Sequence, residues 1–202
     1  MVQPRPVSCT AFRGSTRVAT GTLEQVAQEV KQLIDRGEQA SILIFDDANS
    51  EVLEIDFRGT LAEVLDRLPK APDEPPPRQG PGRPKLGVVG REVTLLPRHW
   101  DWLSRQPGGA SVALRKLVEA AKKANAGADR VRSSRESAYR FMSAMAGDLP
   151  GFEEATRALF AGNEPGFRAQ TASWPSDLRD HATRLAEPAL QGESAKTTKG
   201  RD

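Results

Sequence analysis

The sequence predicts an α+β protein with a small N-terminal ββαββα two-layer unit, a proline-rich linker and a mainly helical C-terminal part. Three observations support this fold class. Strand-like and helix-like apolar patterns alternate over the first 68 residues, seven prolines fall between residues 69 and 85, and helical spacing dominates after the linker. The predicted parts are a small α/β domain (1–68), a Pro/Gly-rich basic linker (69–90), a basic strand-helix-helix element (91–125), a helical region (126–190) and a disordered tail (191–202).

The N-terminal unit is expected to open with a β-hairpin over residues 8–20, which turns at the Gly-Ser pair 14–15. Thr22 and Gln25 then have the spacing of a capping box, in which two side chains satisfy the first free amides of a helix. Apolar residues recur on one face of the helix that follows, and Gly37 is placed to end it in a left-handed conformation.

The second half of this unit repeats the pattern. Residues 41–45 are a buried-strand candidate, and the polar run 46–50 has the composition of a turn. Residues 53–57 alternate apolar and acidic side chains, which is typical of a half-buried fourth strand. Thr60 and Glu63 have capping-box spacing and predict a second helix. We therefore expect a sheet with one face covered by two helices.

After the linker, residues 91–96 are a short strand candidate that leads into Pro97, a residue suited to the first turn of a helix. The Pro-Gly-Gly sequence 107–109 is expected to stop that helix. Ser111 is a plausible N-cap for a second helix, which carries an apolar stripe and four outward lysines and arginines. A strand and two basic helices are therefore expected here.

The C-terminal region is predicted to be helical. Ser133 and Glu136 form a third possible capping box, so a new helix is expected to begin there. Residues 152–160 carry a second apolar stripe, and two shorter helices are expected around Phe167 and Leu178.

Charge is distributed unevenly along the chain. Residues 1–77 hold 8 Lys or Arg against 13 Asp or Glu, residues 78–132 hold 12 against 4, and residues 133–202 hold 9 against 10. A net charge of +2 thus hides a strongly basic middle. A concentration of this kind is typical of a phosphate-binding surface in a protein that stays soluble.

Several classes of function lack support in the sequence. Cys9 is the single cysteine, so no intramolecular disulfide framework exists, and with the distant His99 and His181 it makes no recognisable zinc motif. No run of eighteen apolar residues is present, and no phosphate loop or dinucleotide fingerprint occurs. We expect a cytoplasmic protein with no cofactor, no metal and no membrane association.

Residues 91–123 resemble the ribbon-helix-helix family of bacterial DNA-binding proteins. The resemblance implies a homodimer whose paired strands enter the major groove of duplex DNA, with Arg91 and Thr94 near the bases, while Ser111 and Arg115 approach a phosphate. The adjacent Leu95 and Leu96 depart from the alternation of such a ribbon. A helix-turn-helix is an alternative for the same residues, as is a two-helix element whose basic side chains only contact solvent.

The tetrapeptide Gly-Arg-Pro-Lys at 82–85 resembles the core of an AT-hook, which implies that Arg83 enters the minor groove; a flexible spacer is the alternative. The expected nucleic-acid contacts are Arg83, Pro84, Lys85, Arg91, Thr94, Arg98, Ser111, Arg115 and Lys116.

Two other hypotheses remain open. The acidic run between Asp46 and Asp56 suggests a divalent-cation enzyme site, although turn residues and an outward strand face also explain these carboxylates. Trp100, Trp102 and Trp174 could anchor a protein partner; Trp100 is expected in the core, but Trp102 lies about 200° away on a helix and must face elsewhere. The second hypothesis describes a protein-interaction adaptor without nucleic-acid binding.

On a longer scale, the stretch GRPKLGVVGREVTLLPRHWDWLSRQPGGASVALRKLVEAAKK and the later AYRFMSAMAGDLPGFEEATRALFAG resemble an uncharacterised bacterial family of unknown function (2239). The resemblance implies a bacterial origin and supplies no activity. The leading hypothesis is a dimeric bacterial protein that binds duplex DNA, in the manner of a transcriptional regulator, with RNA binding as a variant.

Overall fold

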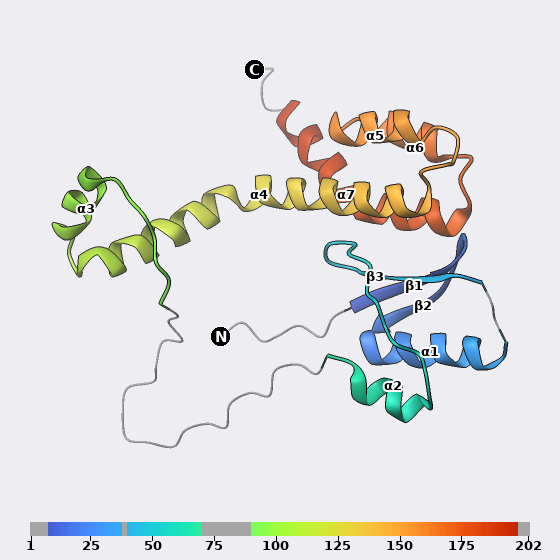
Figure 1. The fold of residues 1–202 in the computed structure, drawn as a ribbon. Helices are drawn as coiled ribbons and strands as arrows, with labels where there is room; N and C mark the ends of the chain where they lie inside the picture. The colour runs from blue at the N-terminus through green and yellow to red at the C-terminus, as the bar shows by residue number, and fades with distance from the viewer. Residues whose placement is uncertain (1–7, 38–39, 70–89, 198–202) are drawn as a thin grey trace. The chain divides into compact units, whose positions relative to one another are not determined.

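The computed structural model describes residues 8–37, 40–69 and 90–197 (Figure 1). The chain divides into two compact units: the first combines Met1–Pro72 with Gly127–Asp202, and the second is Asp73–Ala126. The elements in chain order are β1 (Ser8–Arg13), β2 (Thr16–Thr22), α1 (Leu23–Asp35), β3 (Ile42–Asp46), α2 (Leu61–Arg67), α3 (Pro97–Ser104), α4 (Gly109–Met145), α5 (Phe152–Phe160), α6 (Glu164–Thr171) and α7 (Ser176–Thr197). The α+β class predicted from the sequence is confirmed.

A three-stranded antiparallel sheet of order β2-β1-β3 lies in the first unit. The predicted hairpin joins β1 to β2, and Gly14 adopts the left-handed φ of 53° that its turn requires. The predicted fourth strand at 53–57 does not form. After one isolated bridge between Phe45 and Val52, residues 53–57 pack their apolar side chains against the helices and form no ladder.

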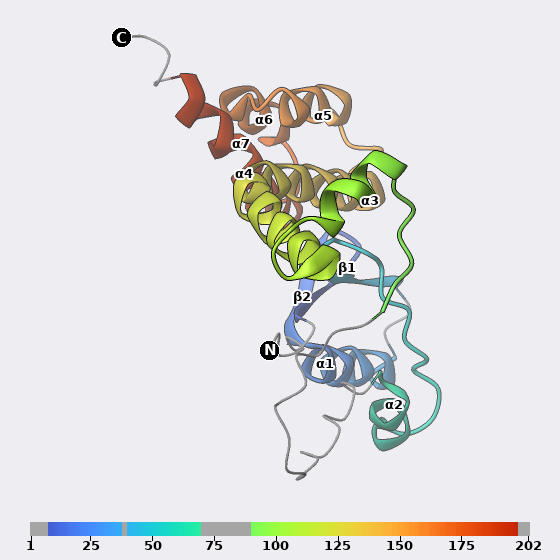
Figure 2. The ribbon, with the colours of Figure 1, turned by 90° about the vertical axis from the view of Figure 1, so that its left-hand side faces the viewer.

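Both faces of this sheet are covered by helices (Figure 2). In β1, Cys9 and Ala11 point to one face of the sheet and Phe12 points to the other, because side chains alternate along a strand. The first face packs on α1 and α2, as the sequence predicts. The second face packs on α4 and α7, which replaces the expected two-layer arrangement with three layers.

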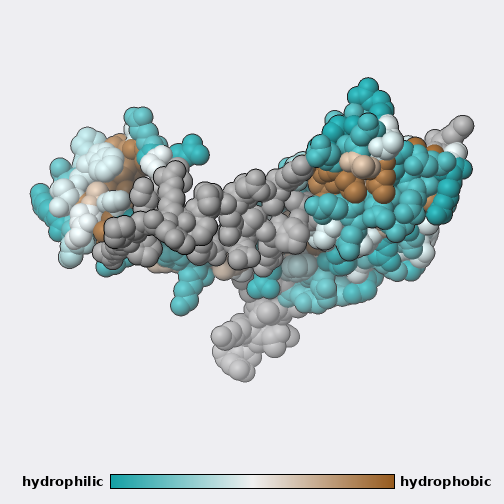
Figure 3. All heavy atoms as spheres, turned by 90° about the horizontal axis from the view of Figure 1, so that it is seen from below, coloured by the Kyte–Doolittle hydropathy of each residue, from teal (hydrophilic) through white to brown (hydrophobic). Residues whose placement is uncertain are grey.

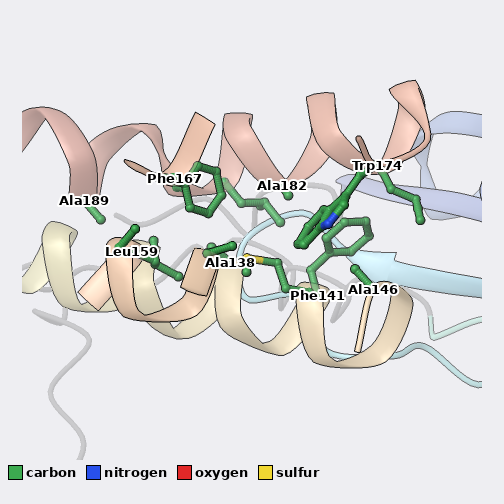
Figure 4. Close-up of a cluster of buried hydrophobic side chains, with 14 of the residues drawn as sticks. Ala138, Phe141, Ala146, Leu159, Phe167, Trp174, Ala182 and Ala189 are labelled. Atoms are coloured by element: carbon green, nitrogen blue, oxygen red, sulfur yellow. The ribbon is translucent and has the colours of Figure 1, made fainter. Parts of the chain in front are cut away.

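The larger hydrophobic cluster joins the sheet to the C-terminal helices. Phe12 and Phe45 contact each other and both contact Phe141 of α4, with ring centroids 5.2–6.3 Å apart. In Figure 4, side chains from α4 and α7 face one another around Phe141 and Trp174. The indole Nε1 of Trp174 donates a 2.8 Å hydrogen bond to the Pro150 carbonyl, which satisfies its polar atom in the core.

The helix-start motifs of the N-terminal part form as expected. Thr22 and Gln25 make a reciprocal capping box on α1, and Thr60 and Glu63 make one on α2. Gly37 follows α1 with φ of 90°, the left-handed conformation predicted for it. Local sequence patterns therefore define these two helices.

Helix α4 corrects two expectations. It begins at Gly109, so Ser111 lies inside the first turn and does not cap the helix. It then continues through Ser133 and Glu136 to Met145, so the third capping box does not form. A capping box requires a non-helical backbone at its first residue, and no proline stands near Ser133 to impose one. The predicted pair of helices is therefore a single helix of 37 residues.

Helix α7 also differs from the prediction. It extends to Thr197, into the polar segment expected to be disordered from Gln191 onward. The helix contains Pro188, whose missing N–H and bulky ring interrupt regular hydrogen bonding. Ser134 of α4 occupies this interruption: its hydroxyl donates to the Leu185 carbonyl at 2.6 Å and accepts from the Ala189 amide at 3.2 Å.

In the second unit, the structure describes residues 90–126, which include α3 and the first part of α4. The Pro-Gly-Gly sequence separates the two helices as expected, with φ of 85° at Gly108. Residues 91–96 form no strand and are mostly exposed, so the predicted ribbon strand is wrong for the single chain. Leu103 and Ala113 are the buried apolar side chains among residues 90–126. Throughout the described residues, no helix has the length and apolar character needed to cross a membrane.

Candidate functional site

The basic residues of the second unit are exposed. Its described part, residues 90–126, holds seven lysines and arginines against three acidic residues. All seven are exposed: Arg91, Arg98, Arg105, Arg115, Lys116, Lys122 and Lys123. Exposed cationic side chains at this density produce a positive potential over the unit.

These seven cations are also unpaired. Among residues that the structure describes, none of them makes an ion pair or a side-chain hydrogen bond. The first unit differs, because eight of its lysines and arginines form ion pairs with carboxylates, such as Arg168 with Glu164 at 2.8 Å and Arg184 with Asp47 at 3.3 Å. Much of the positive charge of the first unit is therefore paired with carboxylates, whereas the described positive charge of the second unit is not.

The start of α4 arranges four of these cations on one side. Residues seven apart on an α-helix differ by only about 20° in direction. Arg115 and Lys122 form one such pair and Lys116 and Lys123 the other, so all four lie within an arc of about 120°. Glu119 falls in the same arc and reduces its charge. This basic stripe suits an extended anionic partner.

The second unit also exposes apolar side chains, which appear brown among hydrophilic residues at the left of Figure 3. Trp100 is 42% exposed and Trp102 is 51% exposed, so the core position expected for Trp100 is wrong. Leu117 and Val118 are exposed on α4. Trp174, considered above as a partner contact, is buried in the first unit. The two exposed tryptophans are therefore the ones available to a partner.

Most of the predicted nucleic-acid contacts fall in this unit. Arg83, Pro84 and Lys85 lie outside the described residues. Arg91 and Thr94 are exposed in the extended segment before α3, and Arg98 is exposed in the first turn of α3. Ser111, Arg115 and Lys116 are exposed in the first two turns of α4.

A separate polar network lies in the first unit, between the sheet and α7. Asp47 accepts hydrogen bonds from Ser8 and Thr10, each at 2.7 Å, and from Arg184 at 3.3 Å. The same guanidinium Nη2 donates to Nδ1 of His181 at 3.1 Å. Because Nδ1 accepts, the proton of the neutral imidazole is on Nε2, which has no hydrogen-bond partner among the described residues.

The network holds its titratable groups in fixed states. Burial opposes ionisation of Asp47, but the hydrogen bonds from Ser8 and Thr10 and the charge of Arg184 outweigh it and lower the pKa of that carboxyl. Burial, followed by the charge of Arg184, lowers the pKa of His181 to about 4. At neutral pH the network is therefore an ionised carboxylate and a neutral imidazole joined by a guanidinium.

This arrangement favours a structural role over catalysis. His181 is only 1% exposed and its ring lies against Phe12 and Phe141, at centroid distances of 5.1 and 4.4 Å. A substrate has no access to the ring. Burial also raises the pKa of the Cys9 thiol to about 11, so that the neutral thiol predominates at physiological pH.

The acidic run considered as an enzyme site is divided: its first part lies in the turn after β3, and Asp56 at its end pairs with Arg58 at 2.8 Å. The Asp46 carboxylate accepts from the Ala48 amide, the buried Ser50 hydroxyl bonds Ser137 of α4 at 2.7 Å, and Arg140 donates to the Asn49 carbonyl. These bonds attach the turn to α4. In the described part of the chain, no three His, Cys, Asp or Glu side chains gather where they could hold a metal ion.

With this geometry established, the chain was compared with known proteins. A family model described as "Uncharacterized protein conserved in bacteria (DUF2239)" matches residues 8–186. The chain belongs to this family. No curated protein and no solved structure gave a significant match.

The DUF2239 match spans both units, from β1 into α7, so it covers the basic element and the polar network alike. The family description names no activity. Sequence patterns identified the basic element through its charge. Sequence patterns did not identify Arg184 as the residue that contacts both Asp47 and His181. Asp47 and Arg184 are 137 positions apart and meet only through tertiary packing.

Proposed function

We propose that this protein binds duplex DNA through the basic surface of its second unit, as a bacterial transcriptional regulator would. The observation that carries the proposal is the contrast in ion pairing. Eight cations of the first unit have carboxylate partners, whereas the seven described cations of the second unit have none among the described residues. Unpaired cations concentrated on one small unit attract a polyanion.

The proposal depends on phosphate contacts and does not require a DNA-reading ribbon. Residues 91–96 supply Arg91 and Thr94 on an extended exposed segment, and α4 supplies Arg115 and Lys116. Each phosphate neutralised by such a side chain releases condensed counterions. Several modest contacts therefore make a large, salt-dependent contribution to the binding free energy. We further propose that Arg83, Pro84 and Lys85 enter the minor groove beside these contacts, because a Gly-Arg-Pro arm is narrow and cationic.

The test is a salt titration of binding to mixed-sequence duplex DNA, measured by fluorescence anisotropy. Replacing Arg98, Arg115 and Lys116 with alanine should weaken binding similarly for every sequence. The slope of log K against log salt should fall by about 0.9 for each phosphate that the variant no longer neutralises. These three side chains are exposed and have no ion-pair partner among the described residues, so the variant should keep its thermal stability.

A matched control removes the same charge from the first unit. Replacing Arg157, Arg168 and Arg179 with alanine deletes three cations, the first two exposed and the third half-buried, that are paired with Glu154, Glu164 and Asp180. This variant should bind DNA nearly as the parent does. Equal losses of affinity for both variants would contradict the proposed surface, and parent binding no stronger than that of a neutral control protein would contradict DNA binding itself.

The exposed tryptophans favour a second candidate, a protein-interaction adaptor or a homodimer formed through the second unit. Trp100, Trp102, Leu117 and Val118 are between 42% and 60% exposed, and tryptophan often anchors interfaces. An adaptor captures its partner with little dependence on salt and loses it when Trp102 is changed. DNA binding shows strong salt dependence, so the titration separates the two. Both candidates fit a cytoplasmic protein.

A further inference from the structure

The first unit contains a groove that combines arginines with one exposed aromatic ring, that of Phe160. It encloses about 720 Å³ between α4, the end of α5 and α7, which is within the range of roughly 300–1,000 Å³ typical of ligand sites. Its lining includes Arg130, Arg132 and Arg135 of α4, and Phe160 of α5. Glu136 is the acidic residue of the lining, and Arg132 is already paired with Asp129 at 2.7 Å; the remaining arginines leave the groove with net positive charge.

The aromatic rings lie at the surface of this region. Phe160 is 49% exposed and Tyr139 is 44% exposed, although their rings contact each other at a centroid distance of 5.9 Å. The contact is edge-to-face, with 65° between the ring planes. Tyr139 is one helical turn beyond Arg135 on α4. Two adjacent rings therefore remain half exposed to water beside guanidinium groups.

Other groups in the groove support recognition of a charged ligand with a planar, apolar face. Arg130 is exposed and makes no ion pair among the described residues. Gln191 donates its amide to Glu187 at 2.9 Å, which leaves its carbonyl oxygen as an acceptor for a ligand N–H. An acidic peptide would satisfy the arginines alone. An unpaired nucleobase with its phosphate would satisfy the arginines, the aromatic faces and the amide.

We propose that this groove binds the bases and backbone of single-stranded nucleic acid. Bases stack on Phe160, and Arg130 contacts a phosphate, because aromatic platforms and cationic grooves together hold single strands without a sequence requirement. Bases of an intact duplex are stacked on one another and do not reach the ring. The site is separate from the basic surface of the second unit and does not require that surface to bind duplex DNA.

The test compares labelled oligo(dT) with a matched strand that lacks bases, using the full chain. Replacing Phe160 with alanine should weaken oligo(dT) binding at least about fivefold, the smallest effect typical of losing one stacked base. The same change should leave binding of the abasic strand and of duplex DNA unaltered. Replacing Phe160 with tryptophan, which keeps an aromatic face, should retain oligo(dT) binding and guards against a folding defect.

The arginine contribution is tested with Arg130→Ala against Arg157→Ala as control, since Arg157 is exposed on α5, pairs with Glu154 and does not line the groove. Arg130→Ala should weaken binding of oligo(dT) and of the abasic strand, and the control should not. Unchanged oligo(dT) binding by Phe160→Ala overturns the proposal, as does equal competition by polyglutamate. The variant with alanine at Arg98, Arg115 and Lys116 should lose duplex binding but keep the oligo(dT) binding that depends on Phe160. This result would show that the two surfaces act separately.

Discussion

His181 occupies an unusual position for a titratable side chain. It is almost fully buried between Phe12 and Phe141, and the one hydrogen bond that its ring makes within the described part of the chain comes from a cation, Arg184. A protonated imidazole at this position would lose its hydration, and its Nδ1 would become a donor facing the guanidinium. The fold therefore requires neutral His181, and the requirement gives stability a defined pH dependence.

We expect the free energy of unfolding to fall as the pH is lowered from 6.5 toward 4. The pKa of His181 is about 4 in the folded protein and close to 6.5 when unfolded, so between these values the unfolded chain binds more protons. The stabilisation is complete above pH 6.5 and is lost as the pH falls toward 4, by an amount on the order of 3 kcal/mol. Urea unfolding at several pH values measures it.

His181→Phe should remove most of this slope, because phenylalanine fills a similar volume without titrating. His99→Gln is the control, since His99 is exposed on α3 and its loss should leave the slope unchanged. Asp47 contributes little between pH 6.5 and 4.5, because its lowered pKa keeps it ionised throughout that range. A full slope in His181→Phe would contradict the assignment.

At the scale of elements, the largely apolar interface between α4 and α7 contains one buried hydroxyl that bonds both helices. Pro188 interrupts the hydrogen bonding of α7, and Ser134 bridges the Leu185 carbonyl and the Ala189 amide. The side chain inserts into the backbone ladder of the partner helix, a known cause of local helix distortion. Ser134 is 8% exposed, so water has little access to replace it.

Ser134→Ala should therefore cost more than an average hydrogen bond. It leaves a buried carbonyl and a buried amide without their partner, which typically costs about 1–3 kcal/mol for each unsatisfied group. We expect a loss of about 2 kcal/mol or more in chemical denaturation. Ser133→Ala, at the exposed neighbouring position, should change stability by less than about 0.5 kcal/mol. Similar effects for both substitutions would show that the bridge contributes nothing.

The same elements show how far sequence patterns predict structure. The capping boxes at Thr22 and Thr60 predicted α1 and α2 correctly, because the signal and the structure it controls are a few residues apart. The box at Ser133 has the same spacing but lies within α4, where packing of Phe141 and its neighbours against α7 favours continued helix. A motif of a few residues carries no information about tertiary packing of this kind.

Long-range contacts explain the remaining differences in fold and site. The second face of the sheet packs on helices that are distant in sequence, so Phe12 and Phe45 gave no indication of their partner Phe141. The groove beside Phe160 likewise depends on three helices meeting. Charge, in contrast, is a property of composition, and the basic second unit was therefore evident from the sequence.

At the scale of the whole molecule, the first unit is assembled from two distant segments of chain. As far as the structure describes the chain, both hydrophobic clusters consist of residues of Met1–Pro72 and Gly127–Asp202. The second unit buries little apolar surface in its described part, where Leu103 and Ala113 are its buried apolar residues. Stability and duplex DNA binding are thus expected to lie in different units.

Replacing Asp73–Ala126 with a Gly/Ser linker of equal length tests this division. Because its core is intact, the first unit should unfold in one cooperative transition, with a midpoint within about 4 °C of the parent, which corresponds to roughly 1 kcal/mol. Duplex DNA binding should disappear, since the unpaired cations are gone, whereas binding of oligo(dT) through Phe160 should persist. Calorimetry and anisotropy on one preparation measure all three.

The reciprocal fragment, Asp73–Ala126 alone, should show no cooperative unfolding, because a segment this small with so few buried apolar residues lacks an adequate core. It should still bind duplex DNA weakly with a strong salt dependence, since charge does not require a fixed fold. If the linker variant instead loses its cooperative transition, α4 residues before Gly127 must contribute to the stability of the first unit. The basic element would then be a structural part of one folding unit, and its charge would have to be tested by the point variants alone.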